Sequence, residues 1–260
     1  MIKDESKLAV NLDDVSKSFG TVHAVKNFDL QIDAGTVFGF LGPNGSGKST
    51  TIKMIMGLLK ADSGNLNVYG IDVSNNPWEV KKIVGYVPES PRLYEFLTGL
   101  EYLDFVADVY GLAAETKKTR IEEYLNAFDL ENRENEMISG YSHGMKQKIA
   151  IIAALLHKPK LLILDEPLSG LDPKSARIVK DLIHKLANEG VTAILSTHVL
   201  EIADAVCDKV AIIYQGSKLA EGNPTELRKE AKMPDSTLEE IFMKLTGTSD
   251  IKAIVEALGK

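Results

Sequence analysis

The stretch Gly42-Pro43-Asn44-Gly45-Ser46-Gly47-Lys48-Ser49 decides the fold of this chain. Its spacing of glycines, lysine and serine fits Gly-x4-Gly-Lys-Ser, the loop that wraps nucleotide phosphates. The apolar residues 37–41 before it predict a buried strand, and residues 50–59 after it predict a helix. The motif requires this setting, because its glycines let backbone N–H groups converge on an anion at the start of a helix. The stretch therefore predicts nucleotide binding.

The side chains of this loop have separate expected roles. Lys48 is expected to reach the β- and γ-phosphates of the nucleotide, and the hydroxyl of Ser49 is expected to ligate Mg²⁺. The rest of the predicted phosphate-binding set is Gly42, Pro43, Asn44, Gly45, Ser46, Gly47 and Thr50.

Polar residues that suit nucleotide chemistry also follow two later apolar runs. The apolar run 161–164 leads directly into Asp165 and Glu166, and such a strand delivers these carboxylates to the carboxyl edge of the sheet, where ligands bind in open α/β folds. Asp165 is expected to hold Mg²⁺, through water, and Glu166 to polarise the water that attacks the γ-phosphate. His198 follows another strand, 191–195, and is expected at the same edge within reach of that phosphate.

Phe19 offers a flat surface for a base.

Composition limits the remaining possibilities. The chain has 260 residues, of which 44% are hydrophobic and 26% charged, and its net charge of −7 argues against a dedicated nucleic-acid binder. Cys207 is the single cysteine, so no intrachain disulfide forms, which suits a reducing cytoplasm. Residues 1–7 lack the apolar core of a signal peptide, and the longest uncharged apolar run, 149–156, is shorter than the roughly 20 residues that cross a bilayer. We expect any membrane role to come through a partner.

Short apolar strands alternate with helical stretches, which is typical of an α/β sheet. Helices are expected after Lys48 and from Ser142, Pro173 and Val199, and turn signals at 215–216 and 221–224 surround a last short strand. The expected strands are 8–15, 28–32, 37–41, 66–68, 83–87, 160–164, 192–196 and 209–214.

Residues 90–156 interrupt this alternation with helix patterns at 100–110, 114–128 and 142–156, which predicts an inserted helical subdomain. The tail contains two capped amphipathic runs, 236–242 and 249–255. The predicted division is therefore 1–89 with 157–222 as the nucleotide-binding core, 90–156 as the helical subdomain, and 223–260 as a helical tail.

Together, the order of the motifs resembles a known family. The segment Tyr141-Ser142-His143-Gly144-Met145-Lys146-Gln147-Lys148 lies between the phosphate loop (Walker A) and the Asp165-Glu166 strand (Walker B), and it resembles the signature of the ATP-binding cassette (ABC) ATPases. It departs from the usual pattern at His143, where glycine is usual, and at Met145, where glutamine is usual. This variant resembles the single-cassette subunits of exporters whose membrane domain is a separate chain. The resemblance implies a P-loop NTPase core, with a mixed sheet flanked by helices and an N-terminal antiparallel β part, plus an inserted helical subdomain.

The resemblance also implies roles for individual residues. Phe19 would stack on adenine, Glu166 would be the catalytic glutamate, and His198 would be the switch histidine. Glu89 stands where a glutamine usually senses Mg²⁺ and the attacking water; a carboxylate adds a charge there but can still ligate Mg²⁺. Asp172 resembles part of a loop that crosses a dimer interface.

The resemblance implies two kinds of partner. Each ATP would lie between the Walker motifs of one cassette and the signature of another, with Ser142 and Gly144 reaching the γ-phosphate. One chain carries one copy of each motif, so a second cassette, identical or paralogous, is required. Residues 91–110, with the apolar Leu93, Tyr94 and Phe96, resemble the surface that grips a cytoplasmic helix of a multi-span membrane protein, although packing within the helical subdomain explains any one of these side chains nearly as well.

The leading hypothesis is therefore an ATP-hydrolysing subunit of a membrane exporter, attached to the cytoplasmic face of the membrane through its partner. A soluble cassette ATPase in a cytoplasmic assembly, such as metal-cluster biogenesis, is the alternative. A translation or DNA-repair ATPase is disfavoured: translation factors normally carry two cassettes, and the interval between Lys48 and Ser142 lacks the sustained heptads of a coiled coil.

Overall fold

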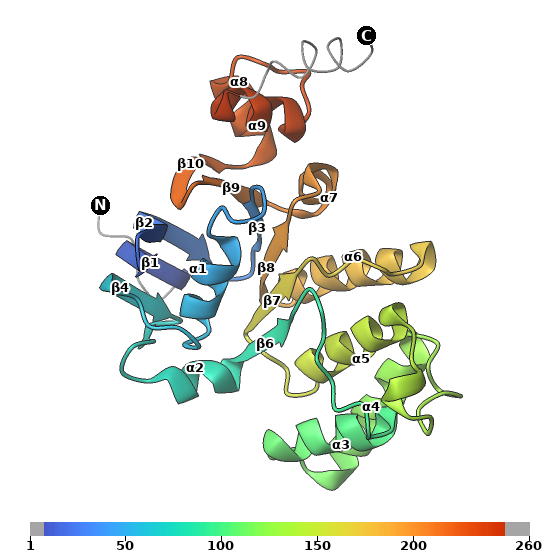
Figure 1. Cartoon of the computed structure of the whole chain (residues 1–260). Coiled ribbons are helices and arrows are strands. Elements are labelled where there is room, and N and C mark those ends of the chain that lie inside the picture. The colour runs from blue at the N-terminus through green and yellow to red at the C-terminus, as the bar shows by residue number, and fades with distance from the viewer. Residues whose placement is uncertain (1–7, 248–260) are drawn as a thin grey trace.

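The strand that precedes the phosphate loop, β3 (Val37–Leu41), is buried at all five positions and lies inside a six-stranded sheet. The computed structural model describes residues 8–247 (Figure 1). The strand order of this sheet is β10-β9-β3-β8-β7-β6. Its other strands are β6 (Val84–Val87), β7 (Leu161–Asp165), β8 (Thr192–Thr197), β9 (Lys209–Tyr214) and β10 (Ser217–Gly222).

The register of this sheet brings the ends of three strands together. All neighbouring strands run parallel except β10, which is antiparallel to β9. Leu41, the last residue of β3, pairs with Thr197 of β8, and Asp165 of β7 pairs with Ser196. The phosphate loop, the two acidic residues and His198 therefore all follow strands at one edge of the sheet.

A separate antiparallel sheet has the order β2-β1-β4-β5. Its strands are β1 (Leu8–Phe19), β2 (Val22–Asp33), β4 (Ser63–Val68) and β5 (Ile71–Asp72). The sequence predicted β1 and β2 too short, at 8–15 and 28–32. The additional residues are mostly exposed or half-buried, so they carry no apolar signal, and pairing across the hairpin holds them in the sheet.

The helices surround the six-stranded sheet and extend to one side of it (Figure 1). They are α1 (Lys48–Ile55), α2 (Pro77–Ile83), α3 (Gly99–Val109), α4 (Ala114–Ala127), η2 (Ile138–Gly140), α5 (His143–Leu155), α6 (Pro173–Asn188), α7 (Leu200–Val206), α8 (Pro224–Glu230) and α9 (Leu238–Thr246). Side-chain caps at Ser142 and Asp172 start α5 and α6 where the sequence predicted helices to begin. The sequence did not predict α2 or β5, and the strand predicted from 83 begins at Val84 because α2 extends to Ile83.

The core consists of two layers, one on each face of the six-stranded sheet. Along β3, Phe38 and Phe40 pack toward the antiparallel sheet and α1, whereas Val37 and Leu41 pack into a cluster shared with α5 and α6. This alternation is the period of two that a strand imposes on its side chains. A mixed sheet with helices around it and a second, antiparallel sheet confirms the predicted α/β fold class.

Residues 90–156 contain α3, α4, η2 and α5, as the helix patterns predicted. Buried residues of α5, such as Ile149 and Ile152, belong to the same cluster as Leu162 of β7, so this helical part shares its core with the sheet. The division into subdomains stays a prediction. The amphipathic run 249–255 lies outside the described residues, and no helix within residues 8–247 is long and apolar enough to span a membrane.

Candidate active site

The phosphate loop, residues 42–49, turns into α1 at Gly47. This residue has φ +112°, in a region that residues with a side chain rarely adopt. A Cβ at this position would also lie 2.5 Å from the carbonyl oxygen of Ala24. The loop is braced from the other side, because the N–H of Gly216 donates to the carbonyl of Ser46 at 2.9 Å. The glycine therefore lets α1 begin directly at the loop.

Lys48 is the charged group of this loop and only 6% of it is exposed. Its Nζ donates hydrogen bonds to the carbonyl oxygens of Gly42 at 2.6 Å and Pro43 at 3.1 Å. Burial lowers the pKa of Lys48, and nearby carboxylates, Glu166 foremost, oppose this shift. The ammonium is thus held at the mouth of the loop beside negative charge.

A hollow of about 480 Å³ opens beside the loop. One side is formed by Asn44, Gly45, Gly47, Lys48, Ser49 and Thr50, all predicted from the sequence to bind phosphate. The other side is formed by Thr21, Val22, His23, Ala24, Lys26 and Gln215, which the sequence did not indicate. These residues belong to no recognisable motif. The one indication in the sequence is that most of them follow Phe19 and the turn at Gly20.

Two further predicted residues lie next to this hollow. Ser46 Oγ is buried and has no hydrogen-bond partner among the described residues, so it offers an unused polar group in the loop. Phe19 ends β1 and pairs with Val22, one of the residues that line the hollow. Phe19 is 52% exposed, and Lys17 Nζ lies 5.6 Å from its ring centroid. The stacking role of Phe19 stays a prediction.

Two of the predicted metal ligands meet where the end of β7 faces the phosphate loop. Asp165 ends this strand, is 8% exposed, and accepts a hydrogen bond from Ser49 Oγ at 3.5 Å. Burial raises the pKa of Asp165, with the charge of Glu166 adding to the effect. Glu89 follows β6 and is exposed, yet its charge is among those that raise the pKa of Lys48 against burial. Within residues 8–247 no group of three or more His, Cys, Asp or Glu could hold a metal by itself.

Glu166 is the most tightly held side chain of the site. Its Oε2 accepts from Thr197 Oγ1 at 2.9 Å, and its Oε1 accepts from both the N–H and Nδ1 of His198, at 2.8 and 2.6 Å. Its backbone has φ +49°, a left-handed conformation that costs a residue with a side chain about 1–2 kcal/mol. The sequence did not indicate Thr197, whose one signal is its place at the end of β8, before His198.

The predicted signature residues lie away from this cluster. Ser142 caps α5, where its Oγ accepts from the N–H of Met145 at 3.3 Å. Neither Ser142 nor Gly144 lines the hollow beside Lys48. A single chain therefore does not bring its own signature to its own phosphate loop.

Asp172 has a structural task within the chain. It caps α6, accepting from the N–H of Ser175 at 2.9 Å and from its hydroxyl at 2.5 Å. The hydroxyl of Ser175 is the main cause that lowers the pKa of Asp172 to about 2. Contact of Asp172 with a second cassette stays a prediction.

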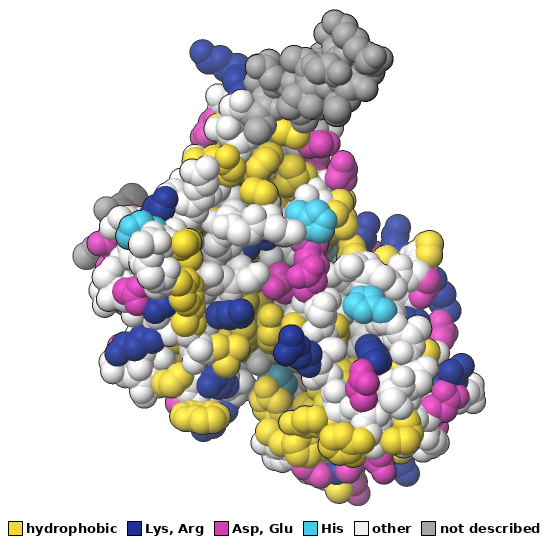
Figure 2. All heavy atoms as spheres, in the orientation of Figure 1, with side chains coloured by type: hydrophobic (Ala, Val, Ile, Leu, Met, Phe, Trp, Pro, Cys, Tyr) yellow, Lys and Arg dark blue, Asp and Glu magenta, His cyan; other side chains and the backbone are white. Residues whose placement is uncertain are grey.

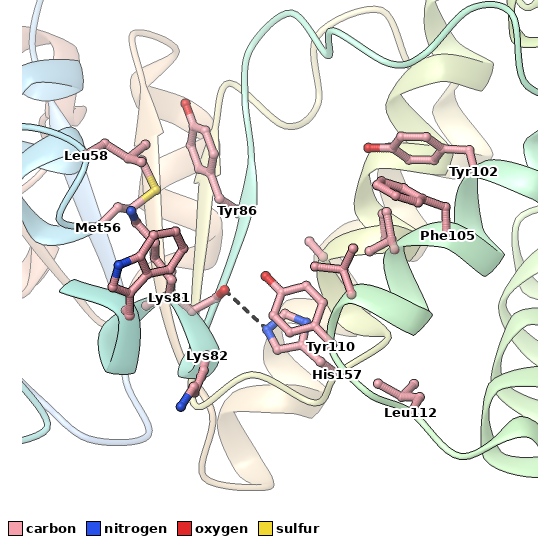
Figure 3. Close-up of a pocket in the computed structure, with 16 residues that line it drawn as sticks. Met56, Leu58, Lys81, Lys82, Tyr86, Tyr102, Phe105, Tyr110, Leu112 and His157 are labelled. Carbon is pink, nitrogen blue, oxygen red and sulfur yellow. Dashed lines mark hydrogen bonds between the residues drawn. The ribbon is translucent and has the colours of Figure 1, made fainter. Parts of the chain in front are cut away.

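A second, larger hollow of about 820 Å³ separates α2 and β6 from α3 (Figure 3). We call it the aromatic groove; it is lined by Met56, Leu58, Trp78, Lys81, Lys82, Val84 and Tyr86 on one side and by Tyr102, Phe105, Val106, Val109, Tyr110, Leu112, Ala153, Ala154 and His157 on the other. His157 stacks on Tyr110 with ring centroids 3.8 Å apart and donates from Nε2 to the carbonyl of Val84 at 3.2 Å.

Hydrophobic side chains also gather on the surface over α3 (Figure 2). Phe96, in the segment before α3, is 71% exposed and Tyr94 is 49% exposed. Leu93 differs, because it packs against the core and is half-buried.

Comparisons with known proteins identify the class to which this fold and site belong. Residues 25–169 match the family model described as ABC transporter, so the chain belongs to the ABC transporter family. The linearmycin resistance ATP-binding protein LnrL of Bacillus subtilis is 40% identical over 215 residues, which cover 83% of this chain and 69% of that protein.

Two solved structures agree with this assignment. An ATP-binding subunit of an ABC transporter superposes with a TM-score of 0.87 at 33% identity, covering 92% of this chain and 99% of that one. The dimeric cassette MJ0796, in a post-hydrolysis state bound to ADP and Pi, has a TM-score of 0.76 at 27% identity, covering 82% of this chain and 98% of that one. The chain is an ATP-binding subunit of an ABC transporter and an ATPase.

Proposed function

We propose that two cassettes close around MgATP, hydrolyse it with Glu166, and thereby drive export through a separate membrane protein. The observation that carries this proposal is the fixed carboxylate of Glu166, bonded on both oxygens beside the phosphate loop. A water between Glu166 and the γ-phosphate would be oriented for attack, because a positioned carboxylate accepts a hydrogen bond from it. His198 holds Glu166 in this orientation.

Mg²⁺ fits the residues at this site. Asp165 and the hydroxyl of Ser49 are hard oxygen donors, the type that Mg²⁺ prefers, and their spacing of 3.5 Å lets both approach one ion. Phosphate oxygens and water would complete its coordination, with Glu89 as a further oxygen donor nearby. The ion would neutralise charge on the phosphates, which otherwise meet the carboxylates of Asp165 and Glu166.

A second cassette would complete the site. Ser142 and Gly144 lie at the amino end of α5, whose partial positive charge suits a phosphate, but they do not line the hollow beside Lys48 in their own chain. A copy or paralogue whose signature faces Lys48 would supply this missing side. The dimeric relative MJ0796, bound to ADP and Pi, supports such an arrangement.

The aromatic groove is the surface that best suits the membrane partner. Its walls are mainly apolar and aromatic, and the exposed Phe96 and Tyr94 extend the apolar surface near it. Lys81 and Lys82 lie at one rim, and none of the described residues that line the groove is acidic. Lys82 is already paired with Glu79 at 2.7 Å, so an apolar helix from a cytoplasmic loop, with an acidic residue facing Lys81, fits this chemistry.

The relative LnrL is named a linearmycin resistance protein, and resistance to a compound supports export as the direction of transport. Attachment to such a partner would hold the chain at the cytoplasmic face of the membrane. The transported substrate would be recognised by the membrane protein rather than by this chain.

Glu166→Gln tests the proposal. We expect this variant to bind ATP as tightly as the wild type, to hydrolyse it at least about 100-fold more slowly, and to accumulate as an ATP-bound dimer in sedimentation experiments. The exposed Glu189→Gln, on the end of α6, is the matched control and should behave as wild type. A monomeric Glu166→Gln protein at saturating MgATP would contradict the shared site.

The same trapped variant tests the membrane partner. Expressed with an affinity tag in its source cells, it should retain a multi-span membrane protein, and Phe105→Glu in the aromatic groove should abolish that retention while ATP-dependent dimerisation persists. Retention of only soluble proteins would favour the cytoplasmic assembly instead.

A further inference from the structure

The ring of Phe19 has a charged partner from its own strand. Lys17 and Phe19 are two residues apart on β1, so their side chains emerge on the same face of the antiparallel sheet. Lys17 Nζ lies over the ring, 5.6 Å from its centroid, which is within the range of a cation–π contact. Only 14% of the Lys17 side chain is exposed, whereas Phe19 is 52% exposed. One face of the ring is therefore engaged within the chain, and exposed ring surface remains for a ligand.

Asp62, the residue before β4, holds this end of β1 at three points. Its N–H donates to the carbonyl of Ser16 at 2.9 Å. Its Oδ1 accepts from Lys17 Nζ at 2.6 Å, and its Oδ2 accepts from the N–H of Ser18 at 2.7 Å. The hydrogen bond from Lys17 is the main cause that lowers the pKa of Asp62, so the carboxylate is ionised at neutral pH. Asp62 thus fixes both the ammonium of Lys17 and the backbone that leads to Phe19.

The hairpin that continues from this strand end borders the hollow beside Lys48. Phe19 pairs with Val22 and Ser18 pairs with His23, and both Val22 and His23 line the hollow. Ser18 Oγ and His23 Nδ1 share a hydrogen bond of 2.9 Å, which holds the strand end from its other side. A nucleotide with its phosphates in the loop would place its base on this hairpin side of the hollow.

We propose that Lys17 and Asp62 are positioning residues for nucleotide binding: Asp62 fixes Lys17, and Lys17 fixes the ring of Phe19 for stacking on the base. This inference rests on the proposed function, in which the chain binds MgATP, and on the predicted stacking role of Phe19. A ring that is fixed before the nucleotide arrives loses less conformational freedom on binding than a rotating one. The pair therefore strengthens binding of the base and takes no part in the reaction at the γ-phosphate.

Steady-state ATPase kinetics separate binding of the base from the reaction. We expect Lys17→Met and Asp62→Asn to raise KM for MgATP about two- to fivefold, the range that corresponds to one cation–π contact, with the loss confined to KM. Lys17→Arg keeps a cation over the ring and should restore KM. Lys60→Met, which removes an exposed lysine of the loop before β4, is the matched control. Thermal unfolding midpoints verify that all variants are folded. A fall in kcat with KM unchanged, or failure of Lys17→Arg to restore KM, would overturn the positioning role.

A ligand without a base tests whether the effect passes through stacking. Inorganic tripolyphosphate with Mg²⁺ has the charges of the ATP phosphates but no ring, so Lys17→Met should not change its inhibition constant. An equal weakening of tripolyphosphate and ATP would overturn the proposal, because Lys17 would then act as a positive charge on the phosphates.

A double-mutant cycle tests the contact with the ring. Phe19→Ala should raise KM at least about fivefold, and Lys17→Met should have no further effect in that background. Additive effects of the two substitutions would overturn the ring as the target of Lys17. An unchanged KM in Phe19→Ala would overturn base stacking and this proposal with it, while ATP hydrolysis and the dimer trapped by Glu166→Gln would still support the proposed function.

Discussion

At the scale of single residues, the site depends on side chains whose freedom has been removed. Lys48 is buried and bonded to loop carbonyls, and Glu166 is bonded through both oxygens to Thr197 and His198. Groups held in advance need little reorganisation when a substrate binds or charge develops, which is the main source of electrostatic catalysis. The individual hydrogen bonds of Lys48 and Glu166 therefore preorganise this edge of the sheet.

Lys48→Ala should weaken ATP binding by about 10- to 100-fold, because a hydrogen bond to a charged group contributes about 1.5–3 kcal/mol. Hydrolysis should fall below detection as well. Lys53→Ala, on the exposed side of the same helix, is the matched control. Calorimetric titration with MgATP measures the affinity, and an affinity equal to that of the wild type would remove Lys48 from the phosphate site.

At the scale of elements, the aromatic groove depends on a contact between helical and sheet parts. His157 follows α5, stacks on Tyr110 next to α3, and donates to the carbonyl of Val84 in β6. Burial lowers the pKa of His157, aided by the positive charge of Arg120 and opposed by the Val84 carbonyl. A neutral imidazole therefore joins three elements at the floor of this groove.

The pKa shift of His157 makes stability depend on pH. Its pKa is lower in the folded chain than its ordinary value of 6.5, so the unfolded chain binds more protons as pH falls through 6.5. The free energy of unfolding should therefore decrease below about pH 6.5, and His157→Gln should flatten this part of the profile. Urea unfolding between pH 5 and 8 measures it, with the exposed His184→Gln as control; parallel profiles for wild type and His157→Gln would contradict the assignment.

The helices and strands differ in how well the sequence predicts their bounds. β3 and β9 have the predicted bounds, because each is an apolar run buried on both faces of the sheet. The exposed ends of β1 and β2 were not predicted, since pairing across the hairpin rather than side-chain pattern fixes them. The seven-residue α2 was not predicted either, because it buries only Val80 and so has no apolar periodicity. Short-range motifs thus located Lys48 and Asp165 beside the hollow before the fold was known. Thr197 and the residues of the β1–β2 hairpin that line the hollow could not be predicted from the sequence. Only the pairing of strands in the folded chain brings them next to the phosphate loop.

At the scale of the whole molecule, the six-stranded sheet separates two apolar layers and carries the site at one edge. Cys207, just after α7, lies in the layer shared with α5 and α6, where its Sγ would lie 3.0 Å from a Cβ on Gly39 of β3. Burial raises the pKa of this thiol to about 12, with the charge of Asp208 adding to the effect. The reaction of this cysteine with a thiol reagent therefore reports unfolding of the core.

Cys207 should resist thiol reagents at pH 8 in the native chain and react at once in denaturant. MgATP at about 100 times its dissociation constant should slow native labelling a further ~100-fold, because binding to the folded state adds about 2.7 kcal/mol to its stability. A thiol assay followed over hours measures both rates, with Cys207→Ala as the blank. Rapid labelling in the native state would show that the core opens locally at α7 rather than as a whole.

The left-handed backbone of Glu166 has a consequence for the way this sequence can change. Glycine would adopt φ +49° without strain and would spare the fold that local cost. Loss of the carboxylate would at the same time leave Thr197 Oγ1 and the N–H of His198 without their acceptor, so the relief of backbone strain and the loss of these hydrogen bonds oppose each other. The strain at this backbone is therefore offset by hydrogen bonds of the same residue, and a chain in which Glu166 became glycine would lose the strain and the bonds together.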